Sequence, residues 1–193
     1  MLYLFLNPDN LDDGFPDLCS KFMPEWRTDI MLSYRSCNDR KLSALGYLLL
    51  IRGLKDRGVF NGMPQFRCGE YGKPYLVGYD GIEFNISHCR HGVAVAVEGA
   101  PVGVDIEDVS EFDDQLARRV CNDGEYRMIC GSVSPAREFC RIWTMKEAVL
   151  KYYGMGIDDT VIKDILINDD FSLDSYNLND GEMFMSVCRQ KIK

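Results

Sequence analysis

The sequence lacks the features that mark membrane, secreted and nucleic-acid-binding proteins. No apolar run in its 193 residues reaches the roughly 18 residues of a transmembrane helix, so we expect no membrane span. Residues 1–10 contain no basic segment ahead of a long apolar one, so we expect no signal peptide and a cytoplasmic protein. Lys and Arg number 22 against 30 Asp and Glu, and the net charge of −8 argues against a nucleic-acid partner, which needs a basic surface.

The eight cysteines include no Cys-x-x-Cys pair, the spacing of many zinc and redox sites. In a cytoplasmic protein we expect them to be reduced and packed as small apolar side chains, without a disulfide framework. The chain has only two histidines, His88 and His91, and no low-complexity segment. What remains is an ordinary globular composition, long enough for one core or for two small fused halves.

Hydrophobic periodicity predicts an α+β fold of two similar halves, residues 1–99 and 100–193, divided at Gly99-Ala100-Pro101. Each half contains a strand, then helices, then two strands. The predicted strands are residues 2–6, 82–86, 93–97, 102–106, 161–167 and 183–188. The predicted helices are residues 40–56, one that ends near 120, a short one after 122, and 135–153.

Local end signals give several of these bounds. Asn38 and Asp39 are the predicted cap of the helix at 40–56. Asn122 followed by Glu125 resembles a capping box, and Pro135 suits the first position of the last helix. Asp180-Gly181 predicts a hairpin turn, and the segment between the first helix and the strand at 82 is expected to be mostly loop.

Two carboxylates mark the predicted strand at 102–106. Asp105 and Glu107 are two residues apart, so their side chains lie on the same face of the strand. Adjacent carboxylates repel each other, which a bound cation or a raised pKa relieves. Carboxylates are preferred ligands of Mg²⁺, so the pair predicts a magnesium site, although a solvated strand face explains this pattern equally simply.

The long helix at 135–153 carries a second charged pair. Glu147 and Lys151 are four residues apart and therefore neighbours on the helix surface, with Trp143 one turn earlier. This places Glu147 at the edge of the buried face. The simpler alternative is an exposed ion pair that contributes only a few tenths of a kcal/mol.

Three further segments have residues suited to anions. Ser87 and His88 end a strand in a polar turn, and Lys73 stands in a loop between Gly72 and Pro74. Arg40 and Lys41 occupy the first turn of a helix, where backbone N–H groups also attract anions. Each of these side chains, taken alone, also fits an ordinary exposed position.

Taken in order, these segments resemble the Sfp-type 4′-phosphopantetheinyl transferases. The matching elements are residues 84–88 (Phe-Asn-Ile-Ser-His), 103–107 (Gly-Val-Asp-Ile-Glu), 143–151 (Trp-Thr-Met-Lys-Glu-Ala-Val-Leu-Lys) and the Gly-Lys-Pro at 72–74. The resemblance implies two α+β halves related by a pseudo-twofold axis, with coenzyme A between them. It also implies transfer of the 4′-phosphopantetheine arm to a serine of an apo acyl or peptidyl carrier protein, with release of adenosine 3′,5′-bisphosphate.

The resemblance assigns chemical roles to residues of this sequence. It implies a site for Mg²⁺, or Mn²⁺, formed by Asp105, Glu107 and Glu147, which hold the metal against the pyrophosphate of coenzyme A. It implies that Glu107 or Glu125 accepts the serine proton and leaves that choice open. Lys151 would bind the phosphate on which negative charge grows in the transition state.

The remaining coenzyme A contacts fall mainly in the first half of the chain. The resemblance implies that Ser87, His88 and Lys73 bind phosphate, most naturally the 3′-phosphate of coenzyme A. Arg40 or Lys41 would assist there. The segment before residue 36 shows no comparable match.

Carrier recognition is implied for residues 112–135, a stretch that mixes arginines with apolar side chains and so suits an acidic carrier helix. Because the chain resembles two fused units, we expect one intramolecular site and a monomer. Two alternatives remain open. One is a non-catalytic relative that binds coenzyme A or a carrier, and the other is an unrelated metal-dependent phosphoesterase. The sequence identifies neither the carrier nor the preferred metal.

Overall fold

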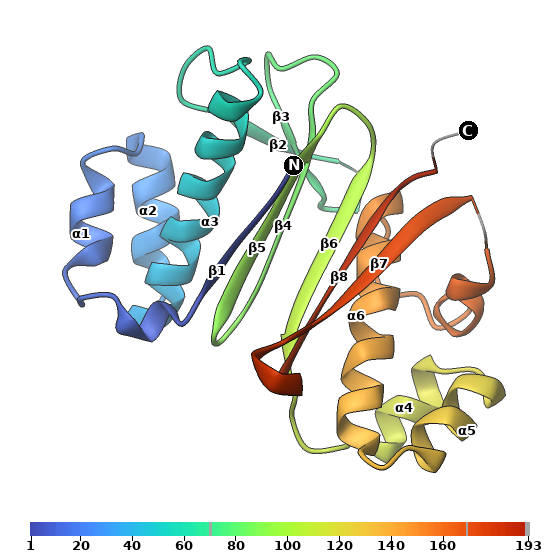
Figure 1. The fold of residues 1–193 in the computed structure, drawn as a ribbon. Coiled ribbons are helices and arrows are strands. Elements are labelled where there is room, and N and C mark those ends of the chain that lie inside the picture. Colours follow the sequence, from blue (N-terminus) through green and yellow to red (C-terminus); the bar gives the residue numbers. More distant parts are fainter. Residues whose placement is uncertain (70, 169, 192–193) are drawn as a thin grey trace.

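The computed structural model describes residues 1–69, 71–168 and 170–191 as helices packed on two three-stranded antiparallel sheets (Figure 1). The first sheet contains β1 (Leu2–Leu6), β4 (Glu83–Cys89) and β5 (Gly92–Glu98), in the order β1-β5-β4. The second contains β6 (Val102–Asp108), β7 (Phe171–Leu178) and β8 (Met183–Gln190), in the order β6-β8-β7.

Both sheets have the same connectivity. In each, the first strand is followed by three α-helices within the described residues, and the third strand lies between the other two. The helices are α1 (Phe15–Ser20), α2 (Glu25–Ser33) and α3 (Cys37–Asp56) in the first half, and α4 (Asp114–Val120), α5 (Asp123–Gly131) and α6 (Pro135–Tyr153) in the second. A short hairpin of β2 (Phe66–Cys68) and β3 (Pro74–Leu76) is added to the first half.

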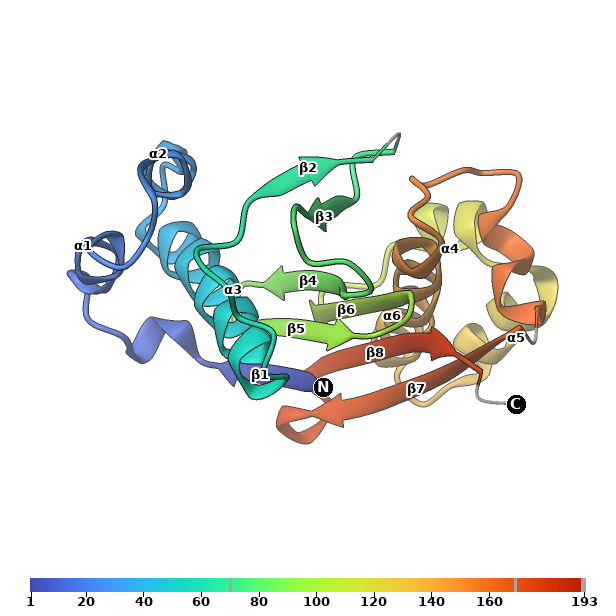
Figure 2. The same ribbon diagram turned by 90° about the horizontal axis from the view of Figure 1, so that it is seen from above.

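The two sheets meet where β4 and β6 run side by side (Figure 2). Side chains join them. The Asn85 side-chain oxygen accepts a hydrogen bond of 2.8 Å from the backbone N–H of Val104, and Lys73 Nζ donates to the carbonyls of Val102 and Tyr152 at 3.1 and 3.3 Å. The chain therefore brings the predicted site segments of both halves to one seam.

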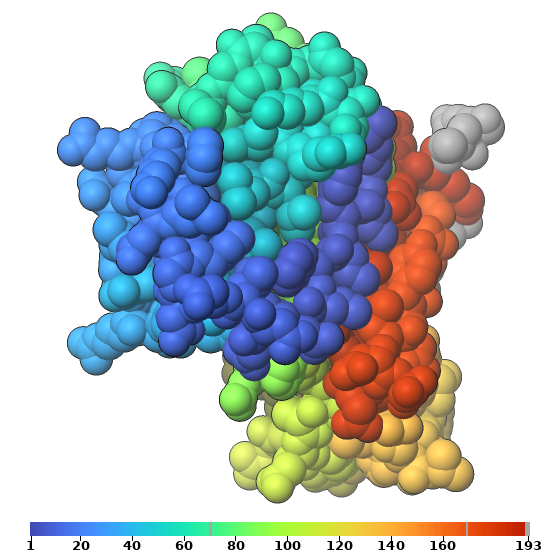
Figure 3. Space-filling model, turned by 60° about the vertical axis from the view of Figure 1, so that its left-hand side comes forward, coloured from blue at the N-terminus to red at the C-terminus, as the bar shows by residue number. Residues whose placement is uncertain are grey.

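Helix α3 covers the first sheet and begins earlier than predicted. Ser36, not Asn38 or Asp39, is its cap, because Ser36 has an extended backbone and its side chain accepts from the backbone N–H of Asp39. Residues 7–35, for which the sequence analysis made no secondary-structure prediction, contain the 3₁₀ helix η1 (Pro8–Asn10) and the helices α1 and α2. Figure 3 shows this segment against α3 on one side of the molecule.

The predicted strand at 161–167 is wrong. Residues Ile162–Ile167 form the 3₁₀ helix η2, in which Ile162 and Ile165, three positions apart, point into the core. The strand before β8 is instead β7, which pairs with the edge of β8 opposite β6. The sequence analysis missed it because most of its side chains are polar and exposed. The predicted turn does connect these two strands: Asn179, Asp180 and Gly181 all have positive φ angles there.

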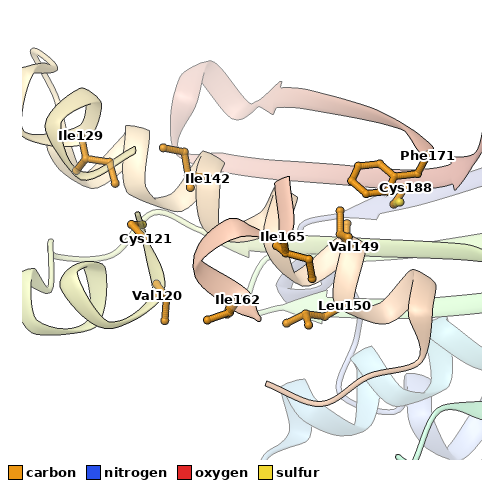
Figure 4. Close-up of a cluster of buried hydrophobic side chains, with 11 residues drawn as sticks. Val120, Cys121, Ile129, Ile142, Val149, Leu150, Ile162, Ile165, Phe171 and Cys188 are labelled. Atoms are coloured by element: carbon orange, nitrogen blue, oxygen red, sulfur yellow. The ribbon is translucent and has the colours of Figure 1, made fainter. Parts of the chain in front are cut away.

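Helix α6 packs on the second sheet through a cluster of buried apolar side chains (Figure 4). Its bounds agree with the prediction, with Pro135 in its first turn and Gly154 ending it in the left-handed conformation. All eight cysteines are free, and five of them are buried as small apolar groups. In the described part of the chain, no helix has both the length and the apolar character needed to cross a membrane.

Candidate active site

A lysine and a carboxylate that were both predicted as site residues lie on different elements and are in contact at the seam between the sheets. Lys151 Nζ, from α6, lies 2.5 Å from Oδ1 of Asp105 on β6. Ser87 of β4 donates from Oγ to the same Asp105 oxygen at 2.8 Å and lies 3.1 Å from Lys151 Nζ. The Asp105 side chain is 1% exposed and that of Lys151 28%, so the ammonium closes the site toward solvent.

The close contact between α6 and β6 depends on Gly103. A Cβ atom at this position would lie 2.0 Å from the carbonyl oxygen of Ala148 and 2.4 Å from the backbone nitrogen of Tyr152. The backbone of the helix therefore rests directly on the backbone of the strand. Asp105 is two residues further along the same face, which places it beside the side chain of Lys151.

The carboxylates around this contact influence one another. Burial raises the pKa of Glu107 to about 7, with a further contribution from repulsion by Asp105 and Glu147 that Lys151 partly offsets. Burial also raises the pKa of Glu147, where Lys151 lowers it and Asp105 raises it. The site thus concentrates negative charge in a partly dry environment, with a single ammonium against it.

Asp105 also has an oxygen without a protein partner. Its Oδ2 atom is buried and makes no hydrogen bond in the structure as described. Buried carboxylate oxygens are normally satisfied, and an exception is a common sign of a ligand or ion. Together with Glu107 and Glu147, this oxygen forms a donor set of the kind that Mg²⁺ or Mn²⁺ takes.

The side chains are not already arranged as metal ligands. Within residues 1–69, 71–168 and 170–191, no group of three or more His, Cys, Asp or Glu side chains has the geometry to hold a metal ion. The Lys151 ammonium instead neutralises Asp105. The donor types fit a hard cation, and holding one requires these carboxylates to turn toward it.

His88, the residue after Ser87, lines an open pocket of about 470 Å³. Its ring is exposed on one side, but the surrounding protein removes part of its hydration, which lowers its pKa; Asp39 opposes this shift and Lys151 adds to it. Arg90 lines the same pocket together with Asn38, at the N-terminus of α3. Arg90 was not among the predicted residues, although its position two residues after His88 was a usable signal.

Lys73 stands in a second, smaller pocket of about 220 Å³, which also contains Lys151. Burial lowers the pKa of Lys73. Its ammonium is held by the two carbonyls at the seam, so it stabilises the contact between the halves in addition to lining the pocket. The other residues of this pocket are Tyr71, Gly72, Pro74, Asn85, Ile86, Gly154 and Met155.

Two predicted anion ligands have other contacts. Lys41 is 4% exposed, and its Nζ donates to the carbonyl of Leu11 at 2.7 Å and to Asp13 at 2.8 Å. Arg40 donates from Nε to the carbonyl of Tyr34 at 2.8 Å. Both side chains therefore fasten the N-terminal segment to α3, and the structure does not bring them to the Lys151–Asp105 contact.

Glu125 also has partners of its own. It completes the predicted capping box of α5 by accepting from the backbone N–H of Asn122 at 3.0 Å, and it forms a 2.9 Å ion pair with the buried Lys146. The structure thus separates the two candidate bases by environment. Glu107 has a raised pKa beside Asp105, whereas Glu125 is bound within a structural network.

Comparisons with known sequences identify relatives of the chain. The model of the 4′-phosphopantetheinyl transferase superfamily matches residues 101–189. The chain is 33% identical to 4′-phosphopantetheinyl transferase gsp of Aneurinibacillus migulanus over 78% of its length and 64% of that protein. It is 30% identical to 4′-phosphopantetheinyl transferase AcpT of Salmonella typhi over 74% of its length and 73% of that protein.

The match to Sfp of Bacillus subtilis (strain 168), also a 4′-phosphopantetheinyl transferase, is shorter. It has 32% identity and covers 48% of this chain and 42% of that protein. The chain therefore spans less than two thirds of gsp and less than half of Sfp in these matches. The superfamily match includes Asp105, Glu107, Glu147 and Lys151.

Proposed function

The chain belongs to the 4′-phosphopantetheinyl transferase superfamily, and from this we propose that it transfers the 4′-phosphopantetheine arm of coenzyme A to a carrier protein. The acceptor is a serine hydroxyl of an apo acyl or peptidyl carrier protein. The observation that carries the proposal is the Lys151–Asp105–Ser87 contact. It joins elements of both sheets and offers an ammonium for a phosphate beside a carboxylate for a divalent cation, and the reaction needs both.

We place coenzyme A along the seam between residues 1–99 and 100–193, taken as two halves related by a pseudo-twofold axis. The identical strand order of the two sheets supports this division. Lys151 lines the pocket of Lys73 and is close enough to His88 to lower its pKa, so cationic groups are available over a length that suits a ligand with several phosphates. His88, with Arg90, would bind the 3′-phosphate, and Lys151 the pyrophosphate.

We propose that Asp105, Glu107 and Glu147 hold Mg²⁺, or Mn²⁺, when coenzyme A is bound. The unpartnered Oδ2 of Asp105 supports a cation there. So do the raised pKa values of Glu107 and Glu147, which come first from burial and then from repulsion between carboxylates, because a bound cation would offset both effects. When bound, the ion would polarise the phosphoryl oxygens and neutralise the departing bisphosphate.

The side chains suggest how the reaction proceeds. The serine oxygen attacks the β-phosphorus of coenzyme A, the bond from that phosphorus to the bridging oxygen breaks, and adenosine 3′,5′-bisphosphate leaves. Lys151 is placed to stabilise the charge that develops on the phosphate oxygens. Of the two candidate bases, Glu107 is the one we propose to accept the serine proton on a carboxylate oxygen, because it lies beside Asp105 and Lys151, whereas Glu125 is bound to Lys146 and to the backbone of Asn122.

We propose the surface of residues 112–135 as the carrier site of a monomeric, cytoplasmic enzyme. Met128 and Val133 are exposed apolar side chains on this surface. Arg118 and Arg119 form ion pairs with Asp114 and Asp159, but these pairs are solvent-exposed and therefore weak enough to exchange for carboxylates of a carrier.

Intact-mass spectrometry tests this function directly. An apo acyl carrier protein and an apo peptidyl carrier domain are each incubated with the protein, coenzyme A and Mg²⁺, and with a chelator or Glu147→Gln in parallel. We expect one phosphopantetheine to be added to a carrier, and the gain to be lost in both controls. Coenzyme A binding without transfer to either carrier would instead identify a non-catalytic relative, and cleavage of coenzyme A without carrier a phosphoesterase.

A further inference from the structure

We propose that Glu125 and Lys146 form a buried positioning pair that sets the carrier-docking helix α5 at a fixed place relative to the phosphate site. This inference rests on the proposed function and assigns Glu125 a role other than that of the base. The Lys146 side chain is 0% exposed and its Nζ lies 2.9 Å from Oε2 of Glu125, which is 13% exposed.

The ammonium of Lys146 has a complete set of partners. Besides Glu125, it donates to the carbonyl oxygens of Ile162 and Lys163 at 2.7 and 2.9 Å. These three acceptors match the three protons that an ammonium offers. A single side chain of α6 therefore holds the start of α5 and the start of η2 at the same point.

Glu125 also has its partners within this network. Its Oε2 atom accepts from Lys146 and from the backbone N–H of Asn122, while the Asn122 side-chain oxygen accepts from the backbone N–H of Glu125. Asn122 also donates to the carbonyl of Lys163. An oxygen that already accepts two hydrogen bonds within a structural network is poorly placed to take a proton from a substrate.

Apolar packing surrounds this network. Ile129 of α5, Ile142 of α6 and Ile162 of η2 belong to one buried cluster (Figure 4). In such surroundings an ion pair that loses one partner leaves an uncompensated charge, which is strongly destabilising, whereas removing both charges is tolerated far better. The pair therefore gives the joint between α5, α6 and η2 a defined geometry.

The functional consequence follows from what the two helices carry. α5 presents Arg127 and the exposed Met128 within the proposed carrier surface. On α6, the residue after Lys146 is Glu147, at the proposed metal site. Because the serine of a docked carrier must reach the phosphate, the relative position of α5 and α6 governs productive carrier binding without touching coenzyme A.

Four variants test the proposal by kinetics at saturating coenzyme A with apo carrier varied. Glu125→Ala and Lys146→Met are expected to raise the carrier KM by about tenfold or more, corresponding to roughly 1.4 kcal/mol, with a small change in kcat and unchanged coenzyme A affinity. Glu125→Gln can still accept both hydrogen bonds but leaves the Lys146 ammonium without a counter-charge, so it is expected to raise the carrier KM less than Glu125→Ala and to leave kcat nearly unchanged. Glu138→Gln, which removes a carboxylate paired with Arg141 on the same helix α6, is the matched control.

A base would behave differently. If Glu125→Gln lowers kcat by about a hundredfold or more while both KM values stay unchanged, Glu125 transfers the proton and the positioning role is overturned. If Lys146→Met does not fold, the double variant Glu125→Gln/Lys146→Met takes its place. Positioning predicts that the double variant folds and keeps most of its kcat, and a loss of kcat in it overturns the proposal.

Hydrogen exchange separates this inference from the function on which it rests. In Lys146→Met, amides of α5 and of residues 158–167 are expected to exchange at least about tenfold faster, while those of β6 and β8 keep their protection. Unchanged exchange in α5 would contradict the positioning role even if the enzyme is active. A wild-type protein that modifies no carrier would contradict the proposed function and leave the exchange result to decide the structural role.

Discussion

Lys151 and Asp105 are 46 positions apart in the sequence, and their charged atoms lie 2.5 Å apart in the structure. The contact brings together the last turns of α6 and the middle of β6, with Ser87 of the other sheet as the third member. It satisfies one oxygen of Asp105, while the other is buried and has no hydrogen-bond partner among the described residues. The same contact therefore fixes the helix on the strand and defines a place where phosphate and a cation can be bound together.

Replacing Lys151 by Met is expected to reduce phosphopantetheine transfer by about a hundredfold or more, because the proposed function places this ammonium at the reacting phosphate. The loss should appear mainly in kcat. Lys163→Met is the control, since that side chain is exposed and the backbone carbonyl that accepts from Lys146 is kept. Equal activity of the two variants would remove Lys151 from the reaction.

Gly103→Ala is expected to destabilise the protein by about 2–4 kcal/mol, because the added methyl overlaps the backbone of α6 and the helix must move away from β6. Transfer activity should fall together with stability, as Lys151 moves away from Asp105. Urea unfolding measures the change. Gly131→Ala, where a Cβ meets nothing within 4 Å, should shift the midpoint only slightly, and similar behaviour of both variants would contradict the close contact.

Local signals in the sequence predicted much of the second half. The start of α6 at Pro135, its end at Gly154 and the capping box of Asn122 and Glu125 are each encoded within a few residues, and all three are present. The strands β4, β5, β6 and β8 were found from their alternating or continuous apolar residues. Asp105 and Lys151 were connected only through the family resemblance, since nothing local joins positions so far apart.

The segments and contacts that the sequence analysis did not predict depend on tertiary contacts rather than on local signals. The 162–167 segment has apolar residues with strand-like composition, but the buried ammonium of Lys146 binds two of its carbonyls and helps to hold it as a 3₁₀ helix. β7 is an edge strand whose pairing with β8 places few of its side chains in the core. Lys41 was a predicted phosphate ligand, but in the structure it pairs with Asp13. This is a tertiary contact that no local pattern contains.

Coenzyme A is expected to bind more tightly as pH falls from about 7.5 to 6. The pKa of His88 is below its ordinary value of 6.5, so the ring is neutral at pH 7 in the free protein. Burying this neutral ring therefore costs stability only as pH falls below 6.5, where the unfolded chain takes up the proton first. A bound phosphate dianion reverses the balance by favouring the protonated ring. Coenzyme A affinity should therefore rise on acidification as protons are taken up.

Isothermal titration calorimetry in buffers of different ionisation enthalpy measures this proton uptake. His88→Gln should bind coenzyme A with little dependence on pH in that interval, and His91→Gln, whose ring is paired with Asp108, is the matched control. Dephospho-coenzyme A, which lacks the 3′-phosphate, should also show little proton uptake. Equal uptake with both ligands would place His88 away from the 3′-phosphate.

With coenzyme A bound, Mg²⁺ is expected to stabilise the folded protein further, since an ion that binds only the folded state adds about 2.7 kcal/mol at a hundred times its Kd. The binding site is built from carboxylates that repel each other, so occupation also relieves the raised pKa values of Glu107 and Glu147. The rise in Tm on adding Mg²⁺ should therefore be larger at pH 8 than at pH 6, where protons compete for these groups.

Glu147→Gln should reduce the rise and Glu111→Gln, a carboxylate on the exposed loop before α4, should not. A Tm that responds to Mg²⁺ equally in wild type and Glu147→Gln would show that the ion binds elsewhere, and a response at pH 6 as large as that at pH 8 would exclude these carboxylates as its ligands.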